Sequence, residues 1–598
     1  MRRKILAPSF TGLVLFLLFS LTPAAFAQSG GQFSVDYTVE IANRDASLFH
    51  VTTRVKGIKE SRLELSLPTW TPGWYTVENY AKNILRLKIT DASGARLAHM
   101  MPRKQTWSVE TKGKSEIKVE FDYHADKLAL NQAKIAKDFA FFTGTELFLE
   151  PLGHRNSTFT VHLVTPQGWK IISALKETSD PTTFTAPDYD TLVDAPTEMG
   201  NFDVTNFSVE GKPHYFVATP AGAFSTEKAQ KFAGMLAKVA SAQSAIFGGL
   251  PYEKYVYFYF FMMAESNAGG ALEHLNSHVS FAPPGQMAQP QQMIGTASHE
   301  FFHLWNVKRI RPAEMWPYDY ARENETPLLW VSEGFTNYYG SVATYRAGVR
   351  NRKEFLETVA GAISGVESNE ARGYVSPADS SASTWLGYDS PVAFSISYYT
   401  QGQNLGALLD LSIRHDTSGA ASLDDVMRTL YRDFYQKGKG FSTEDMISVI
   451  NRLTKRDYHD FYNRYVWGVE VPPYDQIYSY AGIQVEKRQQ KVPTFGLDGR
   501  FSGGGLKVQR VEPGSNAADA GLEVGDVIQK VNGQELFRTS LNDLIGQTVK
   551  LSIKREGQDK ELELKVGSRE EPSYTLIEMP TATPEQLKIR EGWLKTGN

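Results

Sequence analysis

The chain has 598 residues, of which 41% are hydrophobic and 22% charged, and its formal net charge at pH 7 is −4. These values are ordinary for a globular protein of several domains, and the small net charge gives no reason to expect nucleic acid or an anionic membrane as partner. Because the chain contains no cysteine, disulfides, a cysteine-ligated zinc and a lipid-modified cysteine are all excluded.

The N-terminus has the pattern of a secretory signal peptide. Basic residues at 2–4 precede an apolar run at 12–21, and Ala-Phe-Ala at 25–27 is a typical cleavage site. The apolar run is short for a membrane span, and no second candidate span follows. We therefore expect residues 1–27 to be removed, and the mature protein to be periplasmic or secreted without a membrane anchor.

Residues 28–208 are expected to form a β-rich domain. Polar and apolar residues alternate with period two at 33–41, 63–67 and 117–123, as they do in strands with one buried face. We expect an antiparallel, sandwich-like domain that supports the next domain or walls one side of a cleft.

The next domain, expected at residues 209–480, begins with mixed helix and strand signals. A helix is predicted from Ser225 to about Phe247, and the apolar run at 255–263 predicts a buried strand. The glycines that follow, Gly269 and Gly270, permit close approach of another backbone, so this edge suits a peptide bound as an added strand. A plain loop remains the alternative.

The segment His299-Glu300-Phe-Phe-His303 contains His-Glu-x-x-His. On a helix, side chains four residues apart share a face, so both imidazoles can reach one metal ion while Glu300 contacts a metal-bound water. This pattern predicts a catalytic zinc with Glu300 as general base. The cations at 308–311 are expected at the C-terminus of this helix, where they complement its dipole; they are assigned no chemistry.

A catalytic zinc needs a third protein ligand, and four glutamates follow the motif: Glu314, Glu323, Glu325 and Glu333. The first three lie in a polar, loop-like stretch. Glu333 lies in an apolar segment predicted to be helical, where a lone carboxylate is costly unless a metal offsets it. We therefore predict Glu333 as the third ligand and Asn337, one turn later, as a residue that orients a ligand imidazole.

The remainder of the chain is expected to form a helical subdomain at about 340–475, a separate domain of short strands at 481–568 and an extension at 569–598 with a short helix starting near Thr583. The helical subdomain can close a metal cleft from the far side. It contains Tyr398 and Tyr399, which composition alone does not mark as catalytic.

Three motifs together resemble the glycyl aminopeptidase family of zinc metallopeptidases. They are Pro-Thr-Trp-Thr-Pro-Gly at 68–73, the extended metal-helix motif at 299–312, and Trp-Val-Ser-Glu-Gly-Phe-Thr-Asn-Tyr-Tyr at 330–339. The resemblance implies a multidomain α+β protein with an N-terminal antiparallel β domain. It also implies a thermolysin-like zinc peptidase domain that resembles aminopeptidase N, and a C-terminal PDZ-like domain at 481–568.

The resemblance also implies roles for individual residues. Gly269-Gly270-Ala271-Leu-Glu273-His274 matches a motif usually written Gly-x-Met-Glu-Asn, whose residues bind substrate and whose glutamate, here Glu273, holds the free α-amine. His274 replaces the asparagine. Tyr399-Thr-Gln-Gly matches Tyr-x-Lys-Gly, whose tyrosine stabilises the tetrahedral intermediate; the adjacent Tyr398 remains an alternative. The expected cofactor is one Zn²⁺ per chain, and the expected substrates are peptides with a free, small N-terminal residue, Gly or Ala.

Three functions follow as hypotheses: a zinc aminopeptidase, a cell-envelope endopeptidase assisted by its PDZ-like domain, or a non-enzymatic peptide-binding protein with a structural metal. Only a short helix, at about residues 540–545, fits beside the PDZ-like groove. A peptide or protein ligand of that groove and a packing role for the domain are both open.

Overall fold

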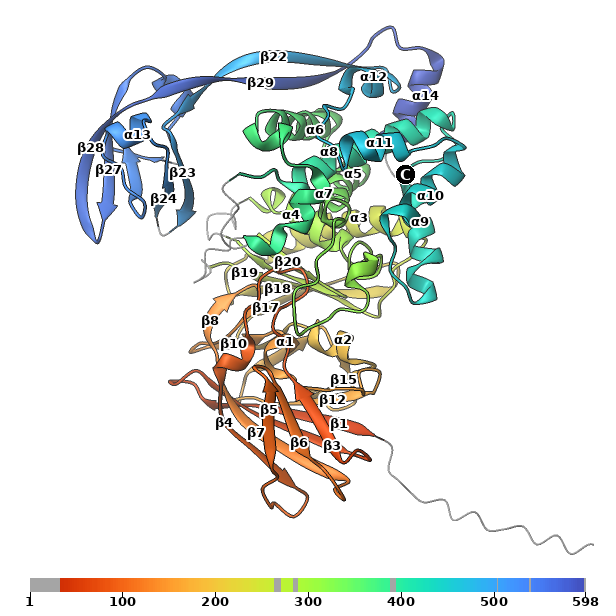
Figure 1. Ribbon diagram of the computed structural model, residues 1–598, viewed down its shortest axis with the longest axis vertical. Coiled ribbons are helices and arrows are strands. Elements are labelled where there is room, and N and C mark those ends of the chain that lie inside the picture. The colour runs from red at the N-terminus through yellow and green to blue at the C-terminus, as the bar shows by residue number, and fades with distance from the viewer. Residues whose placement is uncertain are drawn as a thin grey trace, which may run out of the picture.

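The computed structural model describes residues 33–262, 270–282, 289–387, 394–502, 504–536 and 539–595. Three parts follow one another along the chain (Figure 1): an N-terminal β domain, a central mixed domain with many helices, and a C-terminal β domain at the end of a long two-stranded ribbon. The predicted multidomain α+β fold is confirmed. The predicted signal peptide lies outside the described residues.

The N-terminal domain is built from three sheets. The largest has β1 and β12 parallel at its centre and antiparallel neighbours on either side. Its strands in spatial order are β14 (Lys176–Glu177), β15 (Thr183–Ala186), β12 (Phe159–Val164), β1 (Ser34–Asn43), β2 (Leu48–Lys56), β7 (Glu116–His124) and β4 (Ile84–Asp91). The period-two patterns lie on β1, β3 and β7, and on β7 every second side chain is buried.

The two smaller sheets of this domain lead into segments that contact the central domain, such as Thr69 and Trp70. Their strands in spatial order are β13 (Lys170–Ser173), β16 (Thr197–Gly200), β10 (Phe139–Phe142), β9 (Gln132–Ile135), β8 (Asp126–Ala129) in one, and β11 (Glu150–Pro151), β3 (Arg62–Ser66), β6 (Thr106–Glu110), β5 (His99–Arg103) in the other. Two short helices complete the domain, α1 (Gly144–Leu147) and α2 (Tyr189–Val193).

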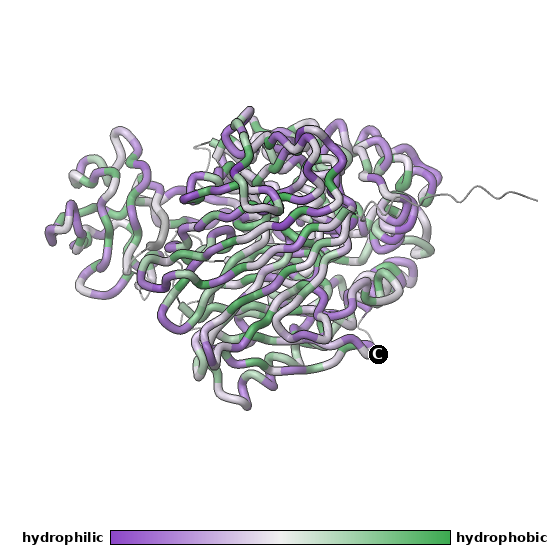
Figure 2. Tube along the Cα trace, turned by 90° about the horizontal axis from the view of Figure 1, so that it is seen from below, coloured by the Kyte–Doolittle hydropathy of each residue, from purple (hydrophilic) through white to green (hydrophobic). Residues whose placement is uncertain are grey.

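The central domain begins with a five-stranded sheet whose spatial order is β17 (Asp203–Val209), β18 (Lys212–Thr219), β19 (Tyr255–Phe260), β21 (Ser277–Phe281) and β20 (Gly270–His274). β18, β19 and β21 are parallel, whereas β20 runs antiparallel to β21 and forms the edge of the sheet. β19 is buried along its whole length. Figure 2 shows hydrophobic and hydrophilic residues alternating along the strands that cross the middle of the molecule.

Helices pack on this sheet and form the helical subdomain. In chain order they are α3 (Thr226–Phe247), α4 (Ile294–Phe302), a π-helical segment (Trp330–Phe335), α5 (Thr336–Arg346), α6 (Arg352–Glu367), α7 (Pro377–Ala382), α8 (Tyr398–Asp416), α9 (Leu423–Asp433), α10 (Thr443–Thr454), α11 (His459–Tyr465) and α12 (Tyr474–Ser479). Ser225 caps α3 by accepting from the amide of Lys228, as a good N-cap residue does. Within the described segments, no helix has the length and apolar character needed to cross a membrane.

The C-terminal domain is inserted into a β-ribbon. β22 (Ile483–Thr494) and β29 (Gly567–Glu578) pair antiparallel along their full lengths, and the small domain lies between them in the chain. That domain contains β23 (Leu497–Ser502), β24 (Gly505–Val511), α13 (Asn516–Asp519), β25 (Val527–Val531), β26 (Gln534–Glu535), β27 (Thr548–Arg555) and β28 (Gln558–Lys565). The helix expected beside its groove is a single 3₁₀ turn, Leu541–Leu544.

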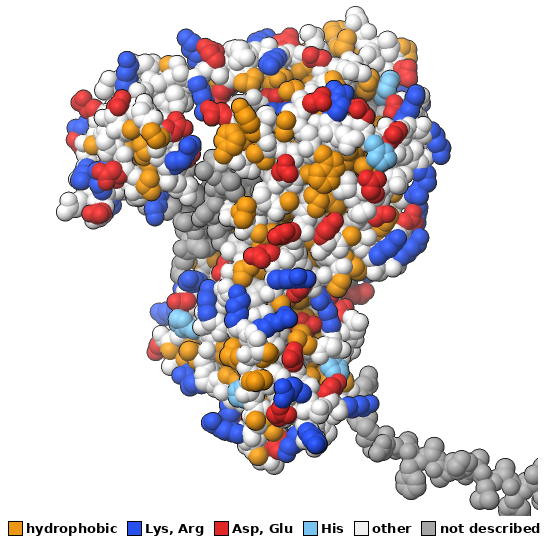
Figure 3. All heavy atoms as spheres, in the orientation of Figure 1, with side chains coloured by type: hydrophobic (Ala, Val, Ile, Leu, Met, Phe, Trp, Pro, Cys, Tyr) orange, Lys and Arg blue, Asp and Glu red, His pale blue; other side chains and the backbone are white. Residues whose placement is uncertain are grey.

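The ribbon anchors this domain to the helical subdomain. β29 lies along α6, and the amide of Tyr574 donates to Ser364 Oγ at 2.9 Å. The last helix, α14 (Pro584–Trp593), returns to the central domain, where the Trp593 indole donates to Tyr338 Oη at 2.9 Å. On the face shown in Figure 3, Lys and Arg side chains gather around the waist between the N-terminal and central domains, and the C-terminal domain stands apart.

Candidate active site and metal centre

Helix α4 presents the His-Glu-x-x-His motif to the interior. Phe301 and Phe302 are buried and anchor one face of the helix in the core. Ser298 ties the helix to its neighbours, since its Oγ donates to Gly340 O on α5 at 2.8 Å and its carbonyl accepts from Gln243 on α3 at 2.7 Å. These contacts fix the direction of α4 and the positions of the side chains it carries.

The third predicted ligand, Glu333, comes from the π-helical segment. Asn306, in the turn after α4, donates to the carbonyls of Val331 and Ser332 at 2.9 and 3.2 Å. Short π-helical stretches leave carbonyls without the regular helical partner and are frequent at functional sites. The sequence predicts an ordinary helix here; the structure shows that a π-helical turn holds Glu333 over α4 instead.

The three predicted ligands meet at one point. His299 Nε2 and His303 Nε2 lie 2.9 Å apart, and Glu333 Oε2 lies 3.5 and 3.2 Å from them. Ligands at 2.0–2.1 Å around a tetrahedral zinc are separated from one another by about 3.3 Å. The spacing of the three atoms therefore fits a zinc ion, as does the donor set of two imidazoles and one carboxylate.

The backbone orients the His303 ring for a metal. His303 Nδ1 donates to the carbonyl oxygen of Asn306 at 2.7 Å, so Nε2, which faces Glu333, is the nitrogen that can ligate a metal. Asn337 lies near enough to His299 to act on the pKa of its ring, but His299 Nδ1 has no hydrogen-bond partner among the described residues, so the orienting role of Asn337 stays a prediction.

A positive charge stabilises the buried carboxylates at this centre. Burial disfavours the charged form of His303, yet the carboxylates of Glu333 and Glu273 raise its pKa to about 10. Burial likewise acts to raise the pKa of Glu333, but the neighbouring His303 and His299 lower it to about 2. A bound cation supplies the charge that a proton on His303 supplies in its absence.

Two further buried carboxylates face the same point. One ligand atom each of Glu273, Glu300 and His303 lies within 4.8 Å of the others. Burial raises the pKa of Glu300 well above its usual range, and the positive charge of His303 opposes this shift. Glu300 Oε2 and Glu273 Oε1 have no hydrogen-bond partner among the described residues. Buried acceptors of this kind are costly unless a ligand satisfies them.

The two candidate tyrosines differ in their surroundings. Tyr398 is 7% exposed, and its hydroxyl lies 2.9 Å from Thr384 Oγ1. The ring of Tyr399 stacks beside the His299 ring at 6.2 Å between centroids, and beside Tyr398 at 4.8 Å. Of the two, Tyr399 is the one partly exposed at the first turn of α8 next to a predicted ligand.

Strand β20 carries the residues predicted to bind substrate. Gly270 has φ +137° and is exposed, Ala271 is half-buried, and Glu273 is 4% exposed. Gly269 lies outside the described residues. His274 is completely buried, and its Nδ1 lies 2.9 Å from Asp194 Oδ1. That position does not suit the contact with substrate predicted for His274, because no surface of its side chain is open.

The sequence predicts Lys308 as a cation at the end of the metal helix; the structure places it beyond the helix, in a buried ion pair. Helix α4 ends at Phe302, and the chain turns so that Lys308 is 2% exposed. Its Nζ lies 3.1 Å from Asp194 Oδ1 and 4.0 Å from Glu273 Oε1. Lys308 and Asp194 therefore belong to the site, and no local pattern in the sequence marks Asp194.

Comparisons with known proteins agree with this geometry. Family models match three segments: the Peptidase M61 N-terminal domain at residues 36–201, M61 glycyl aminopeptidase at 292–405, and a PDZ domain at 479–566. The chain therefore contains the two domains that M61 glycyl aminopeptidases have, followed by a PDZ domain. The resemblance predicted from the three motifs is thereby confirmed, and the chain is a metallopeptidase of the aminopeptidase type.

Several solved structures are similar to this chain. An aminopeptidase N family protein from Idiomarina loihiensis has 25% identity and a TM-score of 0.78, and the match covers 94% of this chain and 100% of that one. An M1 zinc metallopeptidase from Deinococcus radiodurans has 15% identity and a TM-score of 0.48 over 74% of this chain and 94% of that one. Leukotriene A4 hydrolase from Saccharomyces cerevisiae has 14% identity and a TM-score of 0.48 over 75% and 71%. No curated protein matches the chain.

Proposed function

We propose that this protein removes single N-terminal residues from peptides that carry a free α-amine. The observation that supports this best is Glu273, a buried carboxylate whose Oε1 accepts no hydrogen bond from the described residues. One of its oxygens lies within 4.8 Å of ligand atoms of Glu300 and His303. A substrate ammonium pairs with such a carboxylate, and leaving the carboxylate unpaired is expensive.

The predicted ligands His299, His303 and Glu333 would hold one zinc ion per chain. Zinc held in this way supplies a Lewis acid for the scissile carbonyl and makes a water molecule more acidic. Glu300 then accepts the proton of the attacking water and passes it to the leaving amine. Tyr399 donates a hydrogen bond to the carbonyl oxygen as negative charge develops there.

Strand β20 positions the substrate backbone. It is the edge strand of the five-stranded sheet, and among the described strands none pairs with its outer side; its Gly270 end permits close approach of a peptide. A peptide that extends this sheet ends with its amine at Glu273. We propose Gly and Ala as the preferred N-terminal residues, in line with the family.

The sequence also supports a proposal about the compartment in which the enzyme works. The secretory pattern of residues 1–27 suggests export, so we propose that the enzyme processes peptides in the periplasm or outside the cell. Such peptides are its main partners. The PDZ-like domain can bind a further peptide, although its groove is bordered by only one 3₁₀ turn, Leu541–Leu544.

The deciding experiment compares free and acetylated substrates. Wild-type enzyme should cleave glycine p-nitroanilide and leave acetylglycine p-nitroanilide nearly untouched. Glu273→Gln should reduce kcat/KM on the free amine by about 30- to 5,000-fold, which corresponds to about 2–5 kcal/mol for breaking a buried charge pair. Glu198→Gln, at an equally buried carboxylate on β16, serves as the control and should retain activity.

The outcome separates this function from its main alternative. If wild-type enzyme cleaves acetylated and free peptides equally well, the protein is an endopeptidase. Glu273 then has only a structural role, and the PDZ-like domain becomes the natural means of recruiting chains to the metal site.

A further inference from the structure

One tight turn of the N-terminal domain, residues 71–74, lies in the active site. Trp74 donates its amide hydrogen to Thr71 O at 2.9 Å, with Pro72 and Gly73 between them. Gly73 has φ +102°. Proline at the second position and glycine with positive φ at the third are typical of a type II turn. The Pro-Gly of the 68–73 motif is therefore explained by the shape of this turn.

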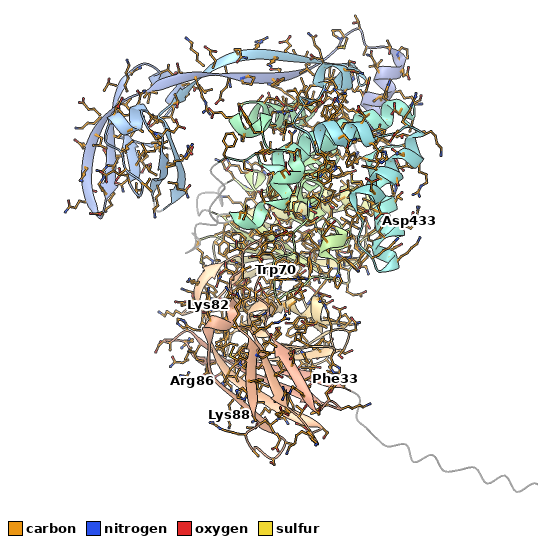
Figure 4. The ribbon with its side chains drawn as sticks, viewed as in Figure 1. Phe33, Trp70, Lys82, Arg86, Lys88 and Asp433 are labelled. Atoms are coloured by element: carbon orange, nitrogen blue, oxygen red, sulfur yellow. The ribbon has the colours of Figure 1, made fainter. Side chains whose placement is uncertain are left out.

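The turn is fixed from both sides. Thr71 Oγ1 lies 2.7 Å from Tyr80 Oη and 2.8 Å from Thr145 Oγ1 within its own domain. Trp70, which Figure 4 places at the junction of the two domains, donates to Asp319 O of the central domain at 2.9 Å. These hydrogen bonds limit how far the turn can move away from the residues that it contacts.

The turn contacts the carboxylate of Glu273. A Cβ added at Gly73 would lie 2.5 Å from Glu273 Oε1, 2.7 Å from Oε2 and 2.8 Å from Cδ. The carboxylate thus lies directly against the bare Cα of Gly73, so a Cβ at this position would displace it, and the positive φ favours glycine as well.

Lys308 clamps the turn to the catalytic domain. Its Nζ donates to Pro72 O at 3.1 Å and to Asp194 Oδ1 at 3.1 Å, both from the N-terminal domain. Asp194 also accepts from the amide of Leu275, directly after β20, at 2.8 Å. Two segments of the N-terminal domain therefore hold the lysine and the end of the strand that carries Glu273.

Because Lys308 pairs with Asp194, the Glu273 carboxylate can bind a substrate cation. Lys308 is paired with Asp194 at hydrogen-bond distance, whereas it lies 4.0 Å from Glu273 Oε1. That oxygen has no hydrogen-bond partner among the described residues although the side chain is 5% exposed. The site therefore presents the Glu273 carboxylate to an incoming cation, with the turn behind it.

We propose that the Pro72–Gly73 turn, clamped by Lys308, is the closed end of the substrate cleft and sets the position of Glu273. It makes the enzyme an exopeptidase because a chain longer by one residue, or an acetylated amine, would have to pass through the turn. This inference rests on the proposed aminopeptidase function and adds to it a specificity determinant from the N-terminal domain.

The test is a double-mutant cycle on the full-length, zinc-loaded enzyme. Gly73→Ala forces Glu273 back by about 0.9 Å, since the added Cβ needs an ordinary contact of at least 3.4 Å and finds 2.5 Å. A displacement near 1 Å costs about 100-fold in kcat/KM. We expect most of this loss to appear as a higher KM. The matched control is Gly94→Ala, which has a similar φ of +85° and nothing within 4 Å; it should behave as wild type.

The second arm uses Glu273→Asp, which shortens the acid by one methylene and withdraws it from the turn. In this background Gly73→Ala should cost less than about threefold, because the two groups no longer meet. Zinc content should remain at the wild-type level in all variants. Calorimetric titration with glycinamide gives a second readout that does not depend on turnover, and the same pattern of losses is expected in its affinity.

The results separate the two claims. An equal loss from Gly73→Ala in both backgrounds would show that the glycine only supports the fold, and full activity of Gly73→Ala would show that the turn does not position Glu273. Either result overturns the inference while the preference for free amines stands. Equal cleavage of free and acetylated substrate by wild type overturns both the proposed function and the role of the turn.

Discussion

Substituting Gly402 with alanine tests how the third ligand is held. Gly402 lies one turn into α8, on the helix that carries Tyr399, where α8 crosses the π-helical segment. A Cβ at this position would lie 2.1 Å from Trp330 O and 2.8 Å from Gly334 Cα. Both are backbone atoms, so the strain is relieved only if the two elements separate, by roughly 1.3 Å (3.4 − 2.1) to reach ordinary contact.

That separation moves Glu333, because this residue lies between Trp330 and Gly334. Overpacking of this kind costs about 1–3 kcal/mol of stability. The functional cost is larger, since ligand distances at a metal site hold within about 0.2 Å and a displacement near 1 Å costs about 100-fold in rate. We expect Gly402→Ala to fold with a lowered melting temperature, to lose zinc on dialysis and to lose about 100-fold in kcat/KM.

The assay measures zinc by elemental analysis, turnover on glycine p-nitroanilide, and thermal unfolding. Gly361→Ala is the matched control: it is a helical glycine of α6 with nothing within 4 Å of an added Cβ. It should keep zinc and activity and gain up to about 1 kcal/mol in stability. Wild-type zinc retention and turnover in Gly402→Ala would refute the reasoning, since the helix contact would then not position Glu333.

Three further predictions concern single residues of the site. Glu333→Ala should lose zinc while Glu323→Ala, at an exposed position, keeps it; full zinc occupancy in the Glu333 variant would contradict the ligand assignment. Glu300→Gln should retain zinc and lose nearly all turnover, because the attacking water keeps its proton; activity within tenfold of wild type would point to another base. Tyr399→Phe should lower kcat by about 10²–10³-fold with little change in KM, and the same loss in Tyr398→Phe instead would transfer the oxyanion contact to that neighbour.

The parts of the site that could be predicted from the sequence depend on short-range geometry. His299, Glu300 and His303 sit on one helix, so their spacing alone places them together. Glu333 could be selected because a lone acid in an apolar segment needs a partner. The predicted helix starting at Ser225 is likewise a local feature, marked by its N-cap.

The parts that could not be predicted arise from contacts between distant segments. Lys308 donates to Pro72 and Asp194, which are 236 and 114 residues away. A lysine after an apolar helix has the same local sequence whether it complements the helix dipole or forms a buried ion pair, and only the fold decides between them. His274 was misassigned for the same reason, since its buried partner Asp194 belongs to another domain.

The ribbon of β22 and β29 has a consequence for how this protein can be altered. The chain leaves the ribbon at Thr494 and re-enters it at Gly567, and these two residues are paired neighbours. The small domain is therefore inserted at the end of a β-hairpin. Cutting the chain near residue 480 would also remove α14 and its Trp593 from the core. Replacing 495–566 with an Asn-Gly turn would instead close the hairpin and leave α14 in place. Other small domains can therefore be exchanged at this point while the metal site and the Pro72–Gly73 turn keep their supports.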